Sequence, residues 1–175
     1  VALGGDGGDI IDGGALRDTF TVYRDRGIAA MDFAADTEWV FNIRSLTEAV
    51  SVMGLNAIQE FKGAHVVVGA DDVVLNDGNR IQSLMHNKIR RDFAGAINAD
   101  NREAVFTVRH DAMGEIWCCV PTQSSQYADR AYIWNWRDDA WSIRDLHNTG
   151  EGGLGVISMD YGRLKQRKLT WQDAQ

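Results

Sequence analysis

The chain has 175 residues, of which 45% are hydrophobic, and this composition is typical of a globular domain with its own core. Its formal net charge of −7 at pH 7 excludes a chain-wide basic surface that would grip nucleic acid. The most apolar stretch, 64–70, is far shorter than the roughly 20 residues of a membrane span, and no signal peptide is recognisable. Because the chain begins at Val1 without an initiator Met, we expect it to be part of a larger chain.

Residues 1–14 are rich in Gly and Asp and predict a loop. Within them, 4-GGDGGDIID-12 matches a calcium-binding nonapeptide, in which Asp9 would be the ligand beside Asp6 and Asp12. That motif binds calcium only between stacked repeats, and the second copy fails at Ala15. We therefore predict a flexible loop and no metal ligand.

Alternating and β-branched residues predict a series of strands through the first half of the chain. The stretch 47–61 does not fit one class of structure, and Gly54 interrupts it. The segment 77-DGN-79 predicts a tight turn, because Gly78 tolerates a positive φ. The expected strands are 16–23, 27–33, 38–46, 64–70, 72–77 and 80–84.

One helix is predicted over about 86–98. Met85, Ile89, Phe93 and Ile97 recur every four residues and form one apolar stripe. Asn87 is the expected cap at the helix start.

Four strand-like segments separated by turn residues follow the helix, and such spacing is typical of an antiparallel meander. A meander of this size corresponds to one β-propeller blade. We therefore expect a mainly β fold, with β-propeller-like antiparallel blades over 15–147 and one short helix. Residues 148–175 predict a loop and the start of a further β segment. The four segments are 104-AVFTVRH-110, 115-EIWCCVP-121, 130-RAYIWNW-136 and 140-AWSIRDL-146.

Side chains in this meander carry two further predictions. Cys118 and Cys119 are neighbours on one strand, so they point to opposite faces and are expected to be buried free thiols rather than a disulfide. Tyr132, Trp134 and Trp136 share one face. We expect Trp134 in the core, and Trp136 either in the core or at a subunit contact.

No constellation in the sequence predicts catalysis, a cofactor or a metal, and we expect no catalytic, cofactor-binding or metal-binding residues. The histidines have no metal-ligand spacing, Ser124 and Ser125 lie in a polar loop, and no G-x-S-x-G elbow is present. The carboxylate pairs Asp71–Asp72 and Asp138–Asp139 fall at turns, where Asp accepts backbone hydrogen bonds. The segment 138-DDAWS-142 resembles the structural turn motif of sialidase blades. The histidines are His65, His86, His110 and His147.

Two basic clusters stand out against the acidic average. We expect each to be a solvated face or a subunit contact, while phosphate binding is the alternative. The clusters are Lys88, Arg90 and Arg91 on the helix, and Arg163, Lys165, Arg167 and Lys168 near the C-terminus.

The run 64-AHVVVGADDVVLNDGNRIQSL-84 resembles the tail nozzle proteins of short-tailed bacteriophages, also called tail tubular protein B or packaged-DNA stabilisation proteins. The resemblance continues through the helical stretch 87–98, Glu115-Ile116-Trp117 and the hairpin from Asp129 to Asp145. Upstream, 17-RDTFTVYRDRGIAAMDF-33 is similar to a pair of strands in that family. The similarity covers about residues 15–147.

The resemblance implies a structural protein of the virion tail, without enzymatic activity, that is assembled in the host cytoplasm. Such proteins form a ring, usually six-fold, below the portal and adaptor proteins. The ring retains double-stranded DNA and then conducts it during ejection, and tail fibres or spikes dock on its outside. The net negative charge fits a channel that repels phosphate, so that DNA slides without sequence-specific binding.

Two other functions remain open from the sequence. A carbohydrate-active or receptor-binding β-propeller of a virion or secreted protein would use Asp71, Glu115 and Trp117 as candidates. A calcium-dependent repeat module would rest on residues 4–12 alone.

Overall fold

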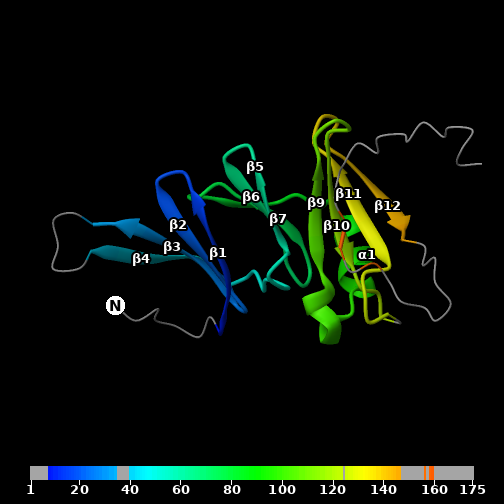
Figure 1. Ribbon diagram of the computed structural model, residues 1–175, viewed down its shortest axis with the longest axis horizontal. Coiled ribbons are helices and arrows are strands. Elements are labelled where there is room, and N and C mark those ends of the chain that lie inside the picture. Colours follow the sequence, from blue (N-terminus) through cyan, green and yellow to red (C-terminus); the bar gives the residue numbers. More distant parts are fainter. Residues whose placement is uncertain (1–7, 35–39, 124, 147–155, 157, 160–175) are drawn as a thin grey trace, which may run out of the picture.

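The computed structural model describes residues 8–34, 40–123, 125–146, 156 and 158–159. Three four-stranded antiparallel sheets follow one another along the chain (Figure 1). One α-helix separates the second sheet from the third in the sequence. In each sheet the strands are hydrogen-bonded in chain order. The predicted mainly β fold with one short helix is confirmed. Within the residues that the structure describes, the three sheets do not close into a ring.

The first sheet, sheet 1, differs from two predictions made for the start of the chain. Residues 10–14, expected to be loop, belong to the first strand, which pairs with the second strand and has a bulge between Ile10 and Asp12. The predicted strand 16–23 is interrupted at Arg17, which has a φ of 56° and turns the chain into the next strand. The strands are β1 (Ile10–Leu16), β2 (Thr19–Arg24), β3 (Gly27–Phe33) and β4 (Phe41–Thr47).

Sheet 2 contains the predicted strand pair and the predicted turn. Gly78 has a φ of 90°, and the Asp77 carboxylate accepts hydrogen bonds from the backbone N–H groups of Asn79 and Arg80 at 2.9 and 2.7 Å. The ambiguous stretch 47–61 supplies the first strand of the sheet at its end. The strands are β5 (Ile58–Phe61), β6 (Ala64–Val68), β7 (Val73–Asn76) and β8 (Ile81–Ser83).

The helix α1 (Asn87–Ala96) is followed by the 3-10 helix η1 (Ala99–Ala104). The predicted apolar stripe is confirmed, since Phe93, Met85 and Ile97 are buried and Ile89 packs against the same core. The expected cap was wrong by one residue. His86 is the N-cap and makes no side-chain capping bond, while Asn87 already lies inside the helix.

Sheet 3 is the predicted meander. Its first strand starts two residues later than expected, because η1 occupies the residues before it. Val156 forms a bridge with Ala128, and most of the predicted C-terminal segment 148–175 lies outside the described residues. The strands are β9 (Phe106–His110), β10 (Glu115–Val120), β11 (Arg130–Asn135) and β12 (Ala140–Asp145).

The main core lies between the sheets and is shared by all three of them and α1. It contains Tyr23 from sheet 1, Val66 from sheet 2, Cys118 from sheet 3 and Phe93 from α1. A second, smaller core on the other face of sheet 3 contains Cys119. Both cysteines are buried and free, as predicted. Their places in two different cores confirm the prediction that they point to opposite faces.

Candidate functional site

Sheets 1 and 2 meet at a buried polar cluster. The Tyr23 hydroxyl lies 2.6 Å from Nδ1 of His65, and the side-chain amide of Asn76 donates to the same hydroxyl at 3.1 Å. All three side chains are buried. The direction of the Tyr23–His65 hydrogen bond depends on the His65 tautomer, because the hydroxyl can both donate and accept.

Burial sets the protonation of this cluster. It raises the pKa of Tyr23 well above its ordinary value and lowers the pKa of His65, since both charged forms lose hydration. The cluster is therefore a neutral hydrogen-bonded contact between two sheets. It was not predicted, because Tyr23 lies 42 residues from His65 and 53 from Asn76 and no sequence pattern links them.

Sheets 2 and 3 meet through aromatic side chains. The ring of Phe61 lies edge-on to Trp134, with the ring centroids 5.4 Å apart, and 4.9 Å from Trp136. Trp134 is buried, as predicted. Trp136, for which a core and a subunit contact were both open, packs against the core of its own chain.

The turn motif 138–142 has the structural role expected of it. The Asp139 carboxylate accepts a hydrogen bond from the Trp134 indole at 3.0 Å. The indole of Trp141 donates to the backbone carbonyl of Leu84 at 2.9 Å. Since Leu84 follows β8, Trp141 ties the outer strand of sheet 3 to sheet 2.

The first strands of sheets 2 and 3 run side by side. Asn56 and Phe106 form a parallel bridge, and the backbone N–H of Thr107 donates to the Asn56 carbonyl at 2.9 Å. Arg109 on β9 reaches the Glu60 carbonyl on β5 at 3.3 Å. The first strands of these two successive sheets therefore lie next to each other and run in the same direction.

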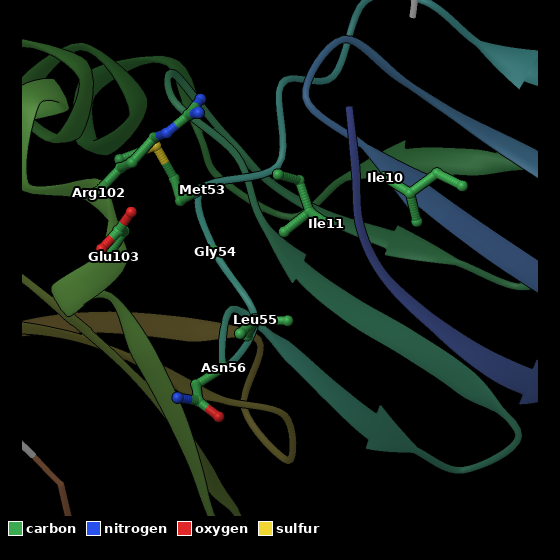
Figure 2. Close-up of a pocket in the computed structure, with 8 residues that line it drawn as sticks. All are labelled: Ile10, Ile11, Met53, Gly54, Leu55, Asn56, Arg102 and Glu103. Atoms are coloured by element: carbon green, nitrogen blue, oxygen red, sulfur yellow. The ribbon is translucent and has the colours of Figure 1, made fainter. Parts of the chain in front are cut away.

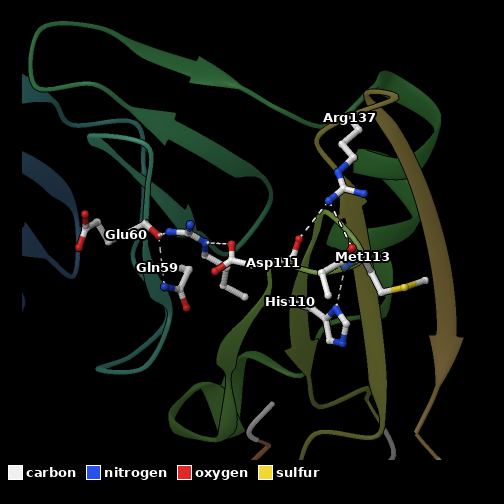
Figure 3. A network of polar contacts seen from close by, with 8 residues as sticks. Gln59, Glu60, His110, Asp111, Met113 and Arg137 are labelled. Carbon is white, nitrogen blue, oxygen red and sulfur yellow. Dashed lines mark hydrogen bonds and ion pairs between the residues drawn. The ribbon is translucent and has the colours of Figure 1, made fainter. Parts of the chain in front are cut away.

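Polar groups near the end of the contact between β5 and β9 hold turns in place (Figure 3). Arg137 donates to the backbone carbonyls of Asp111 and Ala112, each at 3.2 Å. His110 accepts from the backbone N–H of Met113 at 3.1 Å. His110 therefore stabilises the turn between β9 and β10.

A pocket of about 530 Å³ opens between the start of β1 and η1. In Figure 2, Ile10 and Ile11 lie on one side of it, Arg102 and Glu103 on the other. Arg102 forms an ion pair with Asp25, outside the lining. Glu103 is the sole carboxylate among the described lining residues. A glycosidase needs two carboxyl groups, and this pocket does not supply them. The lining residues are Ile10, Ile11, Met53, Gly54, Leu55, Asn56, Arg102 and Glu103.

The three candidates for a carbohydrate site are not brought together. Asp71 pairs with Arg90 of α1 at 3.1 Å, on the side of sheet 3 where α1 packs against Tyr132. Trp117 packs into the smaller core on the opposite face, and its indole donates to Glu115 at 3.0 Å. Glu115 and Trp117 therefore satisfy each other, away from Asp71.

The calcium motif lies only partly within the described residues. Asp6 is outside them, Asp9 is exposed, and Asp12 accepts a hydrogen bond from the neighbouring Gly13 N–H at 2.7 Å. Among the described residues, no group of three or more His, Cys, Asp or Glu side chains is arranged to hold a metal ion.

The basic cluster on α1 is partly neutralised. Arg90 lies 3.4 Å from the Asp72 carboxylate as well as near Asp71, whereas Lys88 and Arg91 are exposed. Burial raises the pKa of Asp72, opposed by its hydrogen bond from Ser83 and by Arg90. His147, Ser124 and the second basic cluster, Arg163 to Lys168, lie outside the described residues.

No protein-family model matches this chain, and no curated protein matches it in sequence. In the part of the chain that the structure describes, no helix is long and apolar enough to cross a membrane.

Proposed function

We propose that this chain is a structural component of a bacteriophage tail, part of a ring-shaped nozzle that retains DNA and conducts it during ejection. The observation that carries the proposal is the repeat of three four-stranded antiparallel sheets in chain order, in the region where the sequence resembles tail nozzle proteins. Consecutive four-stranded sheets of this kind are the building units of β-propellers.

The contacts between the sheets support propeller-like blades. Successive blades pack face to face around a common axis, with their first strands nearest to it. Here sheets 2 and 3 pack through Phe61 and Trp134, and Phe106 of β9 forms a parallel bridge with Asn56, just before β5. In a closed β-propeller, β5 and β9 would then lie near the central axis around which the blades are arranged.

The side chains support a scaffold rather than an enzyme. His65, His110 and Trp141 bond to other parts of the chain in ways that hold sheets and turns. The charge of −7 favours a channel wall over a DNA-binding surface, since carboxylates repel phosphate. Portal and adaptor proteins would bind one end of the ring, and tail fibres or spikes its outside.

The test is the oligomeric state of the chain, measured by mass photometry with and without a portal–adaptor complex. The proposal expects a ring, alone or on the portal. A monomer that ignores the portal would contradict it. The carbohydrate-active or receptor-binding alternative has no observation in its favour among the described residues, and a glycan-hydrolysis screen would test it.

A further inference from the structure

Sheet 1 has two unlike faces. The strand register places Tyr23 and Ile28 on the face that packs into the main core. Leu46, at a β-bulge of β4, packs against the same core. Cross-strand partners share a face, so the pairs Phe20–Met31 and Met31–Ile43 define the opposite one. We call this opposite surface the outer face.

The exposed part of the outer face is apolar and aromatic. Phe20, Phe33 and Phe41 are 40%, 69% and 46% exposed, with Met31 and Ile43 between them in the register. The rings of Phe33 and Phe41 meet edge to face at 6.3 Å. Contiguous exposed side chains of this kind mark interaction surfaces, whereas scattered single ones do not.

The described strand positions of the outer face also carry no acidic side chain. Its strand positions, read from the register of β1 to β4, include no Asp and no Glu, and Arg24 is their single charged member. Asp32 projects to the other side, where it pairs with Arg44 at 2.8 Å. In a chain with a net charge of −7, this is a local exception.

We propose that the outer face of sheet 1 is the contact surface for a second copy of this chain. In a chain with a net charge of −7, a second copy is repelled least at a surface whose described strand positions carry no carboxylate. The inference rests on the proposed ring and names one of its contact surfaces.

The test compares the chain with a Phe33→Asp/Phe41→Asp variant by sedimentation velocity over a wide concentration range, and by assembly on a portal–adaptor complex. The matched control is Leu55→Asp, because Leu55 is 68% exposed but lies at the pocket, not on the outer face. Unchanged thermal unfolding of the monomers would show that all three proteins fold alike.

We expect the unmodified chain and Leu55→Asp to associate equally, and the double variant to associate at least about 100-fold more weakly, since each contact would bury an unpaired carboxylate. Equal association of all three proteins would overturn the contact surface and leave the ring intact. An unmodified chain that stays monomeric, both alone and with the portal–adaptor complex, would overturn the ring as well. This result would assign the outer face to a different partner.

Discussion

At the scale of single residues, the contact between sheets 1 and 2 depends on the Tyr23 hydroxyl. In Tyr23→Phe, Nδ1 of His65 and the Asn76 amide would both lose their buried partner. An unsatisfied buried polar group costs about 1–3 kcal/mol, so we expect the free energy of unfolding to fall by at least about 1 kcal/mol. Urea unfolding measures it, and an unchanged midpoint would show that the cluster contributes nothing.

His65 makes stability depend on pH. Burial lowers its pKa in the folded chain, while Glu60, Asp12 and the backbone of Ala15 act in the opposite direction. The unfolded chain therefore binds a proton to His65 at a higher pH than the folded one, near its ordinary value of about 6.5. The contribution of His65 to the free energy of unfolding is complete above that pH. It is lost as the pH falls from that value towards the folded pKa.

Unfolding at pH 7.5 and 5.5 tests this dependence. We expect the free energy of unfolding to decrease less in His65→Gln than in the unmodified chain, since the Gln amide does not titrate. His86→Gln is the control, because His86 is exposed at the helix start, and it should keep the full decrease. The same pH dependence in all three proteins would contradict the role of His65.

The two thiols should be inert in the folded chain. Burial raises the pKa of Cys118 well above its ordinary range and that of Cys119 to about 12, and thiolate is the reactive form. We expect no reaction with a thiol reagent under native conditions at mildly alkaline pH, and reaction of both cysteines in urea. Rapid labelling of the native chain would mean that one face of sheet 3 opens.

At the scale of elements, the aromatic contact of Phe61 joins sheet 2 to sheet 3. Phe61 is 6% exposed and touches two tryptophans, so Phe61→Ala should lower the free energy of unfolding by about 3–5 kcal/mol. Leu55→Ala, at a well-exposed apolar position, should change it by less than about 0.5 kcal/mol. Comparable losses from both substitutions would argue against a packed contact between the sheets.

The elements that the sequence predicted are those with strong local periodicity. The helix stripe ending at Ile97 and the meander of sheet 3 repeat at fixed spacings, and the Asp-Gly turn at Gly78 has its own chemistry. β1 was missed because its glycines weaken the strand pattern, while its pairing with β2 is a long-range property of the sheet. The helix cap was assigned to Asn87 from residue preference alone, which does not fix a boundary to one position.

The contacts between elements were beyond prediction for a different reason. The buried cluster of Tyr23, His65 and Asn76 joins three strands of two sheets, and no spacing in a single sequence encodes such a meeting. The turn motif around Trp141 was recognisable because its role is partly local. The absence of a convergent site for Asp71, Glu115 and Trp117 became visible only once the faces of sheet 3 were known.

At the scale of the whole molecule, charge gives the last prediction. A protein that grips DNA neutralises phosphates with Lys and Arg, and its affinity falls steeply with salt. This chain carries 25 Asp and Glu residues against 18 Lys and Arg, and Arg90, in the basic cluster on α1, is paired with carboxylates. As a channel wall it should let DNA pass without binding it.

We therefore expect no detectable association with double-stranded DNA in fluorescence anisotropy, even at low salt, while a basic DNA-binding protein serves as the positive control. Binding that weakens with salt would contradict a repelling channel wall. In that case a Lys88→Glu/Arg91→Glu variant would decide the source, because both side chains are exposed on α1. Loss of binding would place DNA on the helix, and the ring would then hold DNA by contact rather than by confinement.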